Sequence, residues 1–150
     1  MPGKKNRKRR IVVVCHNIRS RHNVGSIFRT ADGAGVSKIF LCGITPTPPH
    51  PNIEKVSLGA EKYIEWEKHR DARRVIEKLK KEDFQIVSLE HTKGAVCYDK
   101  FFSKKRSLVA LVIGNEVNGL PESVLRKSDE IIYIPMLGKK ESLNVSGAFG

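Results

Sequence analysis

The stretch IIYIPMLGKKESLNVSGAFG, residues 131–150, is the one around which the rest of the chain is organised. We interpret Ile131–Ile134 as a short buried strand that Pro135 ends, because proline cannot donate to a strand ladder. Gly138 permits a turn or a close backbone approach to a ligand, and Ser142 is a good helix N-cap. Such a strand-to-helix junction is where α/β proteins usually bind ligands, although an ordinary connection would show the same pattern.

Toward the N-terminus, apolar β-branched runs alternate with amphipathic segments. The expected strands are Ile11–Cys15, Val36–Cys42, Tyr63–Trp66, Phe84–Leu89 and Leu108–Ile113, the last being the most apolar and therefore central. We expect three helices: one from Asn23 or Ser26 to Gly33 or Gly35, one from Asp71 to Glu82, and one from Pro121 to about Lys127. A short helical turn is expected within Ile53–Ala60. We expect an extended proline-rich loop at 43–51 and irregular structure at 92–106. The alternation predicts an α/β fold, a mostly parallel sheet with helices on both faces.

A chain of 150 residues is expected to form one domain. We divide it into a disordered basic arm, residues 1–10, and a domain, residues 11–150. It has no run of about 18 apolar residues for a membrane helix and no signal-peptide core, so we predict a cytoplasmic protein without membrane contact. Cys15 and Cys42 lie in apolar runs and are expected as buried thiols. Neither the cysteines nor the histidines show metal-ligand spacing, so we predict no metal site.

The formal net charge is +12, with 28 Lys and Arg against 16 Asp and Glu. Clustered basic charge favours a polyanionic partner such as RNA, although a merely soluble basic protein would also show an excess. The clusters include Arg70 with Arg73 and Arg74, and Lys78 with Lys80 and Lys81. Our candidate RNA-binding residues are Lys4, Lys5, Arg7, Lys8, Arg9 and Arg10 of the arm, with Arg19, Arg21 and Arg29.

Polar residues gather in three loops that follow strand ends, namely Asn17–Arg29, Gly114–Leu120 and Gly138–Ser146. Each loop alone has an ordinary explanation as a cap, a turn or a surface acid. Because the carboxyl ends of parallel strands meet at one edge of a sheet, we expect the three loops to converge there and form a site. No P-loop, dinucleotide-binding fingerprint or nucleophile elbow is present.

Three motifs carry a family resemblance: NxxxRHNVGSIFRTADGAGV from Asn17, IGNEVNGL from Ile113 and IPMLGKKESLNVSGAFG from Ile134. In this order they resemble the motifs of the SPOUT superfamily, in its SpoU/TrmH branch of RNA ribose 2′-O-methyltransferases, over residues 11–150. The resemblance implies a C-terminal trefoil knot, S-adenosyl-L-methionine as cofactor, and a homodimer whose sites are completed across the interface. It implies no metal.

The resemblance also implies roles for particular residues. The cofactor-binding residues would be Leu89, Gly114, Glu116, Gly119, Ile134, Met136, Ser142, Leu143 and Asn144, with Glu90 and His91 near the adenosine. The catalytic residues would be Arg29, Asn23, Glu116, Ser142 and Asn144. Because a guanidinium stays protonated, we expect Arg29 to stabilise the alkoxide rather than to act as a free base. Asn23 would orient Arg29 or the ribose.

Two departures from the family pattern shape the remaining expectations. The sequence stops six residues after Asn144, so we expect the last helix to be truncated. There is no separate N-terminal RNA-binding domain, which favours tRNA over rRNA. Two alternatives stay open: a non-catalytic RNA-binding or ribosome-assembly module, and a methyltransferase that acts on an RNA base.

Overall fold

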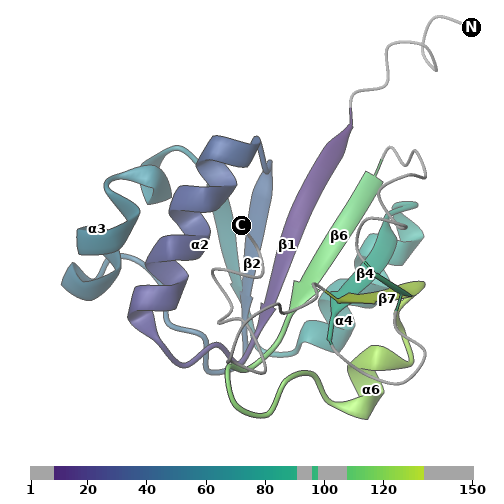
Figure 1. Cartoon of the computed structure of the whole chain (residues 1–150). Helices are drawn as coiled ribbons and strands as arrows, with labels where there is room; N and C mark the ends of the chain where they lie inside the picture. The colour runs from purple at the N-terminus through teal and green to yellow at the C-terminus, as the bar shows by residue number, and fades with distance from the viewer. Residues whose placement is uncertain (1–8, 91–95, 98–107, 134–150) are drawn as a thin grey trace, which may run out of the picture.

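The structure is a computed structural model, and it describes residues 9–90, 96–97 and 108–133. A seven-stranded sheet has the order β3-β2-β1-β6-β4-β7-β5, and every pair of neighbours is parallel (Figure 1). The strands are β1 (Arg10–His16), β2 (Lys38–Cys42), β3 (Glu65–His69), β4 (Gln85–Leu89), β5 (Val96–Cys97), β6 (Leu108–Ile113) and β7 (Glu130–Tyr133). The predicted parallel α/β sheet is confirmed, and β6 lies at its centre.

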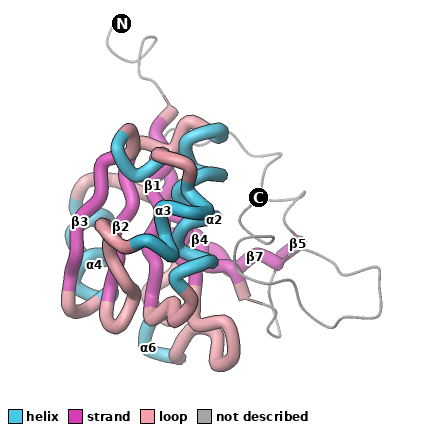
Figure 2. The backbone as a smooth tube through the Cα atoms, turned by 90° about the vertical axis from the view of Figure 1, so that its left-hand side faces the viewer, coloured by secondary structure: helices cyan, strands magenta, loops and turns pink. Residues whose placement is uncertain are grey.

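Helices cover both faces of the sheet, as predicted (Figures 1 and 2). α2 (Arg21–Ala34) and α3 (Pro51–Ser57), with the short turn η1 (Ala60–Lys62), lie on one face, while α4 (Ala72–Lys81) and α6 (Glu122–Leu125) lie on the other. Side chains alternate along β1, so Val13 packs in the core beneath α2 and Val12 in the core beneath α4. Burial on both faces explains why the strand sequences are continuously apolar.

The start of α2 differs from the prediction. The helix is capped by Ser20, whose side chain accepts a hydrogen bond from the backbone N–H of Asn23 at 3.1 Å. Asn23 and Ser26 lie inside the helix, so the expectation that either caps it was wrong. The predicted stop at Gly35 is confirmed, since Gly35 has φ 77°, a conformation that glycine adopts without strain.

Other boundaries shifted by a few residues. β2 starts at Lys38 rather than Val36, and β3 covers Glu65–His69 rather than Tyr63–Trp66. β5 falls within the stretch that we expected to be irregular. Asp71 caps α4, whose predicted extent is confirmed. Ile134, at the end of the expected last strand, lies outside the described residues.

The thiols of Cys15 and Cys42 are buried and free, as predicted. Burial raises the pKa of both, for Cys42 to about 12, so both stay protonated and act as small apolar side chains. Within the described residues, every helix is too short or too polar to span a bilayer.

The contact between α2 and α3 depends on Gly25. A methyl group there would lie 2.7 Å from the carbonyl oxygen of Ile53 and 2.8 Å from Cβ of Val56, whereas at Gly33 it would meet nothing within 4 Å. We expect Gly25→Ala to lower the free energy of unfolding by about 1–3 kcal/mol through overpacking. Gly33→Ala, the control in the same helix, should raise it by about 0.5–1 kcal/mol. Urea denaturation measures both, and equal effects would contradict this account.

Candidate active site

The carboxylate of Glu116 joins the loop after β6 to the loop after β1. Its Oε1 accepts a hydrogen bond from the backbone N–H of Arg19 at 3.0 Å. Its Oε2 accepts from the backbone N–H of Ser20 at 3.0 Å and from Nδ2 of Asn23 at 3.1 Å. Two of the predicted catalytic residues, Asn23 and Glu116, therefore meet although they lie 93 positions apart.

A second connection, through Asn115 and Asn17, was not predicted as part of the site. Nδ2 of Asn115 donates to the backbone carbonyl of Asn17 at 2.8 Å, and Oδ1 of Asn115 accepts from the N–H groups of Val117 and Asn118. Oδ1 of Asn17 accepts from the N–H of Ile44 at 3.0 Å. An asparagine one or two residues after an apolar strand was the available sequence signal. The positive φ of 55° at Asn17 suits asparagine better than most residues.

The surroundings of Glu116 keep its carboxylate charged. Burial alone would raise the pKa of Glu116, but the hydrogen bonds from Arg19, Ser20 and Asn23 outweigh burial and hold the pKa below its usual value. Because both oxygens are engaged within the chain, Glu116 is suited to positioning the loop and Asn23. It is poorly suited to accepting a proton from a substrate.

The loop after β6 is closed by a backbone bridge between Asn115 and Gly119. Gly119 has φ 68°, and a Cβ there would lie 2.3 Å from the Glu90 carboxylate, which accepts a hydrogen bond from the N–H of Leu120 at 3.2 Å. A Cβ at Gly114 would lie 2.6 Å from the carbonyl carbon of Gly119. Both positions therefore require glycine for the loop to pack this tightly.

Four predicted cofactor residues, Leu89, Gly114, Glu116 and Gly119, come together at this loop. β4 pairs with β6, so Leu89 at the end of β4 lies at the same edge of the sheet as Gly114 and Gly119. Glu90 follows Leu89 and packs against Gly119. The remaining predicted residues of the third motif, Ile134, Met136, Ser142, Leu143 and Asn144, lie outside the described residues, as do His91 and the segment predicted to form the knot.

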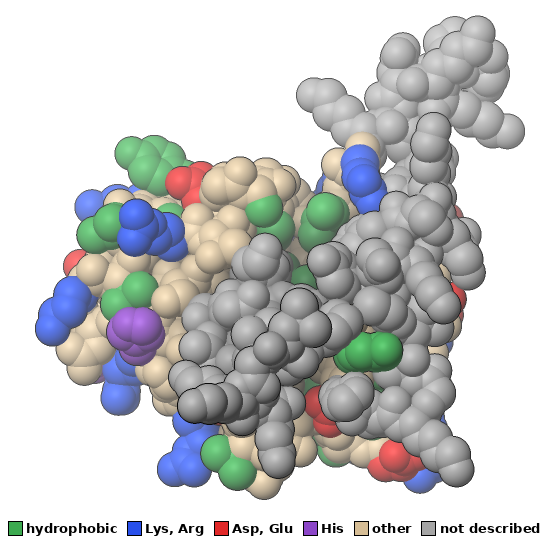
Figure 3. Space-filling view, viewed as in Figure 1, with side chains coloured by type: hydrophobic (Ala, Val, Ile, Leu, Met, Phe, Trp, Pro, Cys, Tyr) green, Lys and Arg blue, Asp and Glu red, His purple; other side chains and the backbone are tan. Residues whose placement is uncertain are grey.

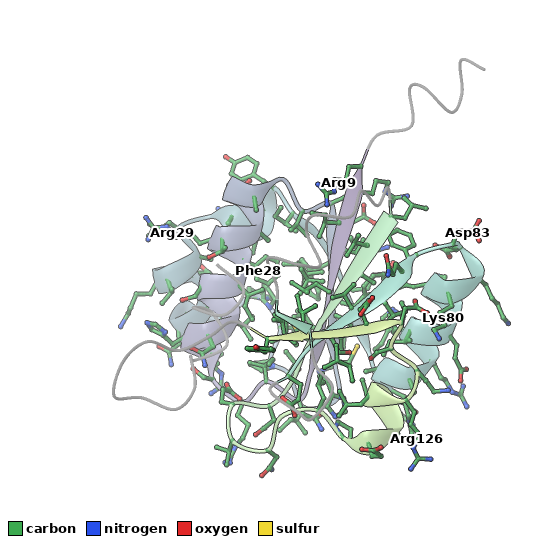
Figure 4. All side chains as sticks on the ribbon, turned by 45° about the vertical axis from the view of Figure 1, so that its right-hand side comes forward. Arg9, Phe28, Arg29, Lys80, Asp83 and Arg126 are labelled. Carbon is green, nitrogen blue, oxygen red and sulfur yellow. The ribbon has the colours of Figure 1, made fainter. Side chains whose placement is uncertain are left out.

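Arg29 is not brought to Glu116 within one chain. Asn23 and Arg29 are six residues apart on α2, which corresponds to about 9 Å along the helix axis and about 240° around it. Arg29 is exposed and points outward from α2 (Figure 4). Among the described residues it takes part in no hydrogen bond or ion pair, and the contacts of Asn23 are with Ser20 and Glu116.

The predicted RNA-binding residues fall at opposite ends of the sheet. Arg19 and Arg21 are exposed at the start of α2, beside the Glu116 contacts. Arg9 and Arg10 lie at the amino end of β1 (Figure 4), where the guanidinium of Arg10 lies 5.5 Å from the centre of the Phe84 ring. Lys4, Lys5, Arg7 and Lys8 lie outside the described residues. Where the structure describes the chain, no three His, Cys, Asp or Glu side chains are placed to hold a metal ion.

The model of the SpoU rRNA Methylase family matches residues 10–150. The chain belongs to this family. This SpoU-family chain is 31% identical over 144 residues to the tRNA (guanosine(18)-2′-O)-methyltransferase of Aquifex aeolicus, covering 96% of the chain and 67% of that relative. It is 29% identical over 140 residues to the 23S rRNA (guanosine-2′-O-)-methyltransferase RlmB of Vibrio parahaemolyticus, a match that covers 93% of the chain and 56% of that relative.

Solved structures agree with the fold. The SpoU-family chain matches the AdoMet-bound rRNA methyltransferase from Sinorhizobium meliloti with a TM-score of 0.83 and 30% identity, over 93% of the chain and 52% of that structure. It matches the TrmH/SpoU tRNA modifying enzyme of A. aeolicus with a TM-score of 0.83 and 30% identity, over 96% of the chain and 72% of that structure. The predicted family is confirmed. The chain spans between about half and just under three quarters of the length of these relatives.

The contacts of Glu116 predict a pH-dependent contribution to stability. We expect Glu116→Gln to lower the free energy of unfolding by about 1–2 kcal/mol at pH 7, since hydrogen bonds to a charged acceptor are lost. The folded pKa lies below the unfolded value, so this contribution is full above about pH 5 and is lost as the pH falls through the folded pKa. Urea denaturation of both proteins at pH 7, 5 and 4 tests the trend.

The control is Glu122→Gln, an exposed acid on α6 whose nearest cationic contact, Arg126, is 3.8 Å away. It should change stability by no more than about 0.5 kcal/mol at any of these pH values. A Glu116→Gln difference that is equally large at pH 7 and pH 4 would rule out the charged carboxylate as the cause.

Proposed function

We propose that the chain is the catalytic part of an RNA ribose 2′-O-methyltransferase that uses S-adenosyl-L-methionine. The observation that carries this proposal is the Glu116 carboxylate, which joins the first and second sequence motifs at the carboxyl edge of the sheet. Relatives named as tRNA and rRNA guanosine 2′-O-methyltransferases support the reaction class. Similar structures with the cofactor bound support the donor.

The described residues fit such a cofactor. Gly114 and Gly119 hold backbone groups close together where a side chain would collide, and Leu89 offers an apolar side chain at the adjoining strand end. We expect Ile134, Met136, Ser142, Leu143 and Asn144 to complete this site. When bound, S-adenosyl-L-methionine supplies an electrophilic methyl group; the protein has to orient the acceptor and stabilise its charge.

The acceptor in this proposal is a ribose 2′-hydroxyl. The ribose oxygen would receive the methyl group, the electrons of the methyl–sulfur bond would stay on the donor's sulfur, and the hydroxyl proton would pass to solvent water. Asn23 is held by Glu116 through Nδ2, and its Oδ1 takes no hydrogen bond among the described residues, so it can accept one from the ribose. The guanidinium of Arg29 would stabilise the developing alkoxide.

Arg29 can take this role from a second copy of the chain. It lies on the exposed side of α2, turned away from the Glu116 contacts of its own chain. A symmetric homodimer would present the α2 of each copy to the other. We therefore propose a homodimer in which each site combines Arg29 of one copy with Asn23 and Glu116 of its partner.

We place the enzyme in the cytoplasm, with tRNA or rRNA as substrate. The net charge of +12 suits either RNA, and relatives act on both. Incubation with labelled S-adenosyl-L-methionine and separate tRNA and rRNA pools, followed by digestion to nucleosides, tests the proposal. A labelled 2′-O-methylnucleoside supports it. Label on a base favours a base methyltransferase, and no label on any RNA favours a non-catalytic RNA-binding protein.

Arg29→Ala should lower kcat about 10²- to 10³-fold, because one cationic group that stabilises transition-state charge is removed. Affinity for S-adenosyl-L-methionine should stay unchanged in calorimetric titration. Arg29→Lys is the control: it keeps the charge and should retain more activity than Arg29→Ala. Full activity of the alanine variant would exclude Arg29 of either copy from stabilising the transition-state charge.

Sharing of the site can be tested by mixing two inactive variants. Arg29→Ala and Asn144→Ala chains, unfolded together and refolded, should form heterodimers in which one of the two sites carries neither substitution. Random pairing gives about a quarter of the wild-type activity. If both residues act within one chain, the heterodimer has no intact site and the mixture stays inactive.

A further inference from the structure

A cavity of about 680 Å³ opens at the carboxyl ends of β1, β2 and β3, on the face of the sheet that carries α4 and α6. Its lining also includes Pro121, Ser123 and Val124, which follow the Gly114–Leu120 loop, so the cavity adjoins the predicted cofactor loop without including its residues. Its wall includes Asn17, which also borders the candidate active site. The cavity therefore lies next to the candidate active site, and none of the catalytic roles proposed above uses it.

The wall of the cavity is cationic. It contains Arg70, Arg73 and Arg74 together with the acid Asp71. Asp71 is already engaged: it caps α4 through the N–H of Arg73 at 2.9 Å and pairs with the Arg73 guanidinium at 3.0 Å. Arg70 and Arg74 are exposed and form no ion pair among the described residues. The guanidinium groups of Arg70 and Arg74 thus remain accessible at the cavity, although Arg74 lies within electrostatic range of Asp71 and Glu77.

A row of cations continues from the cavity along α4. Arg74, Lys78 and Lys81 follow one another at spacings of four and three residues, which places them on one side of the helix over about 10 Å. The row ends near Phe84, on whose ring Arg10 lies. It therefore links the strand-end cavity to the start of β1, where the basic arm joins the domain.

On the part of the α2 and α3 side that Figure 3 shows uncovered, the Lys and Arg side chains stand apart from one another. Guanidinium groups bind phosphate with two parallel hydrogen bonds, and a line of cations matches a chain of phosphates.

We propose that this cavity, with the α4 row, is a second RNA contact that binds backbone phosphates through Arg70 and Arg74. This inference rests on the RNA substrate of the proposed function and deepens it. The RNA would pass from the candidate active site over Asn17 into the cavity and then along α4. Such contacts position an RNA without reading its sequence.

The test is the salt dependence of RNA binding by an Arg70→Ala/Arg74→Ala double variant. Fluorescence anisotropy with a labelled, unmodified tRNA transcript gives the affinity from 50 to 200 mM salt. Loss of two phosphate contacts should make the slope of log K against log salt shallower by about 1.4–1.8. Wild-type affinity should then fall about tenfold more than variant affinity across this range.

The control is Lys55→Ala/Lys62→Ala, which removes the same charge from exposed positions on α3 and η1. Its slope should equal that of the wild type, and a slope as shallow as that of the arginine variant would overturn the proposal. The arginine variant should keep its thermal midpoint and its affinity for S-adenosyl-L-methionine. RNA methylation with an unchanged slope would refute the second contact alone, whereas a changed slope without methylation would refute the proposed reaction alone.

Inorganic phosphate, titrated at constant ionic strength, distinguishes an RNA backbone from a free ion. In the wild type it should compete weakly with the transcript, and in the arginine variant this competition should disappear. Saturation of the cavity by phosphate without any effect on RNA binding would show a site for a free anion and would also overturn the proposal.

Discussion

The candidate site depends on one carboxylate. Parallel strands bring loops to the same edge of a sheet, but pairing alone leaves the loops free to adopt different positions. Glu116 removes that freedom by accepting three hydrogen bonds, two from backbone N–H groups after β1 and one from Asn23. Since these bonds offset the burial of a charge, the loops and the ionised state of Glu116 stabilise each other.

The asparagines extend this arrangement across three neighbouring strand ends. Asn17 connects the loop after β1 to Ile44 beyond β2, and Asn115 connects the loop after β6 to Asn17. Amides serve here because each carries both a donor and an acceptor. Asn115 uses both on backbone groups, whereas Asn17 accepts from the backbone N–H of Ile44 and its Nδ2 contacts Nε2 of His16. The edge is thus held mainly by side-chain-to-backbone bonds. The bond between Asn23 and Glu116 joins two side chains and uses Nδ2 of Asn23, so Oδ1 of Asn23 takes no hydrogen bond among the described residues.

The sequence predicted what local pattern determines and missed what distant contacts determine. The run Leu108–Ile113 was placed correctly because a strand buried on both faces is continuously apolar. The start of α2 was misplaced because Ser20, Asn23 and Ser26 are all capping types, and the choice depends on Glu116 holding the N–H of Ser20. β3 was shifted because an edge strand, EWEKH, shows no apolar run. Helical spacing, in contrast, could already have separated Asn23 from Arg29.

The charge balance at this edge explains how a polyanion can approach a site that contains acids. Glu116 and Asp71 both lie at the strand ends, yet each is surrounded by donors from its own chain. Exposed arginines flank these acids, with Arg19 and Arg21 on one side of the sheet and Arg70 and Arg74 on the other, while the exposed acid Glu122 on α6 is paired with Arg126. In the proposed complex, the acids therefore shape the loops while the arginines meet the phosphates. Removing an internal donor would expose negative charge to the RNA as well as loosening the fold.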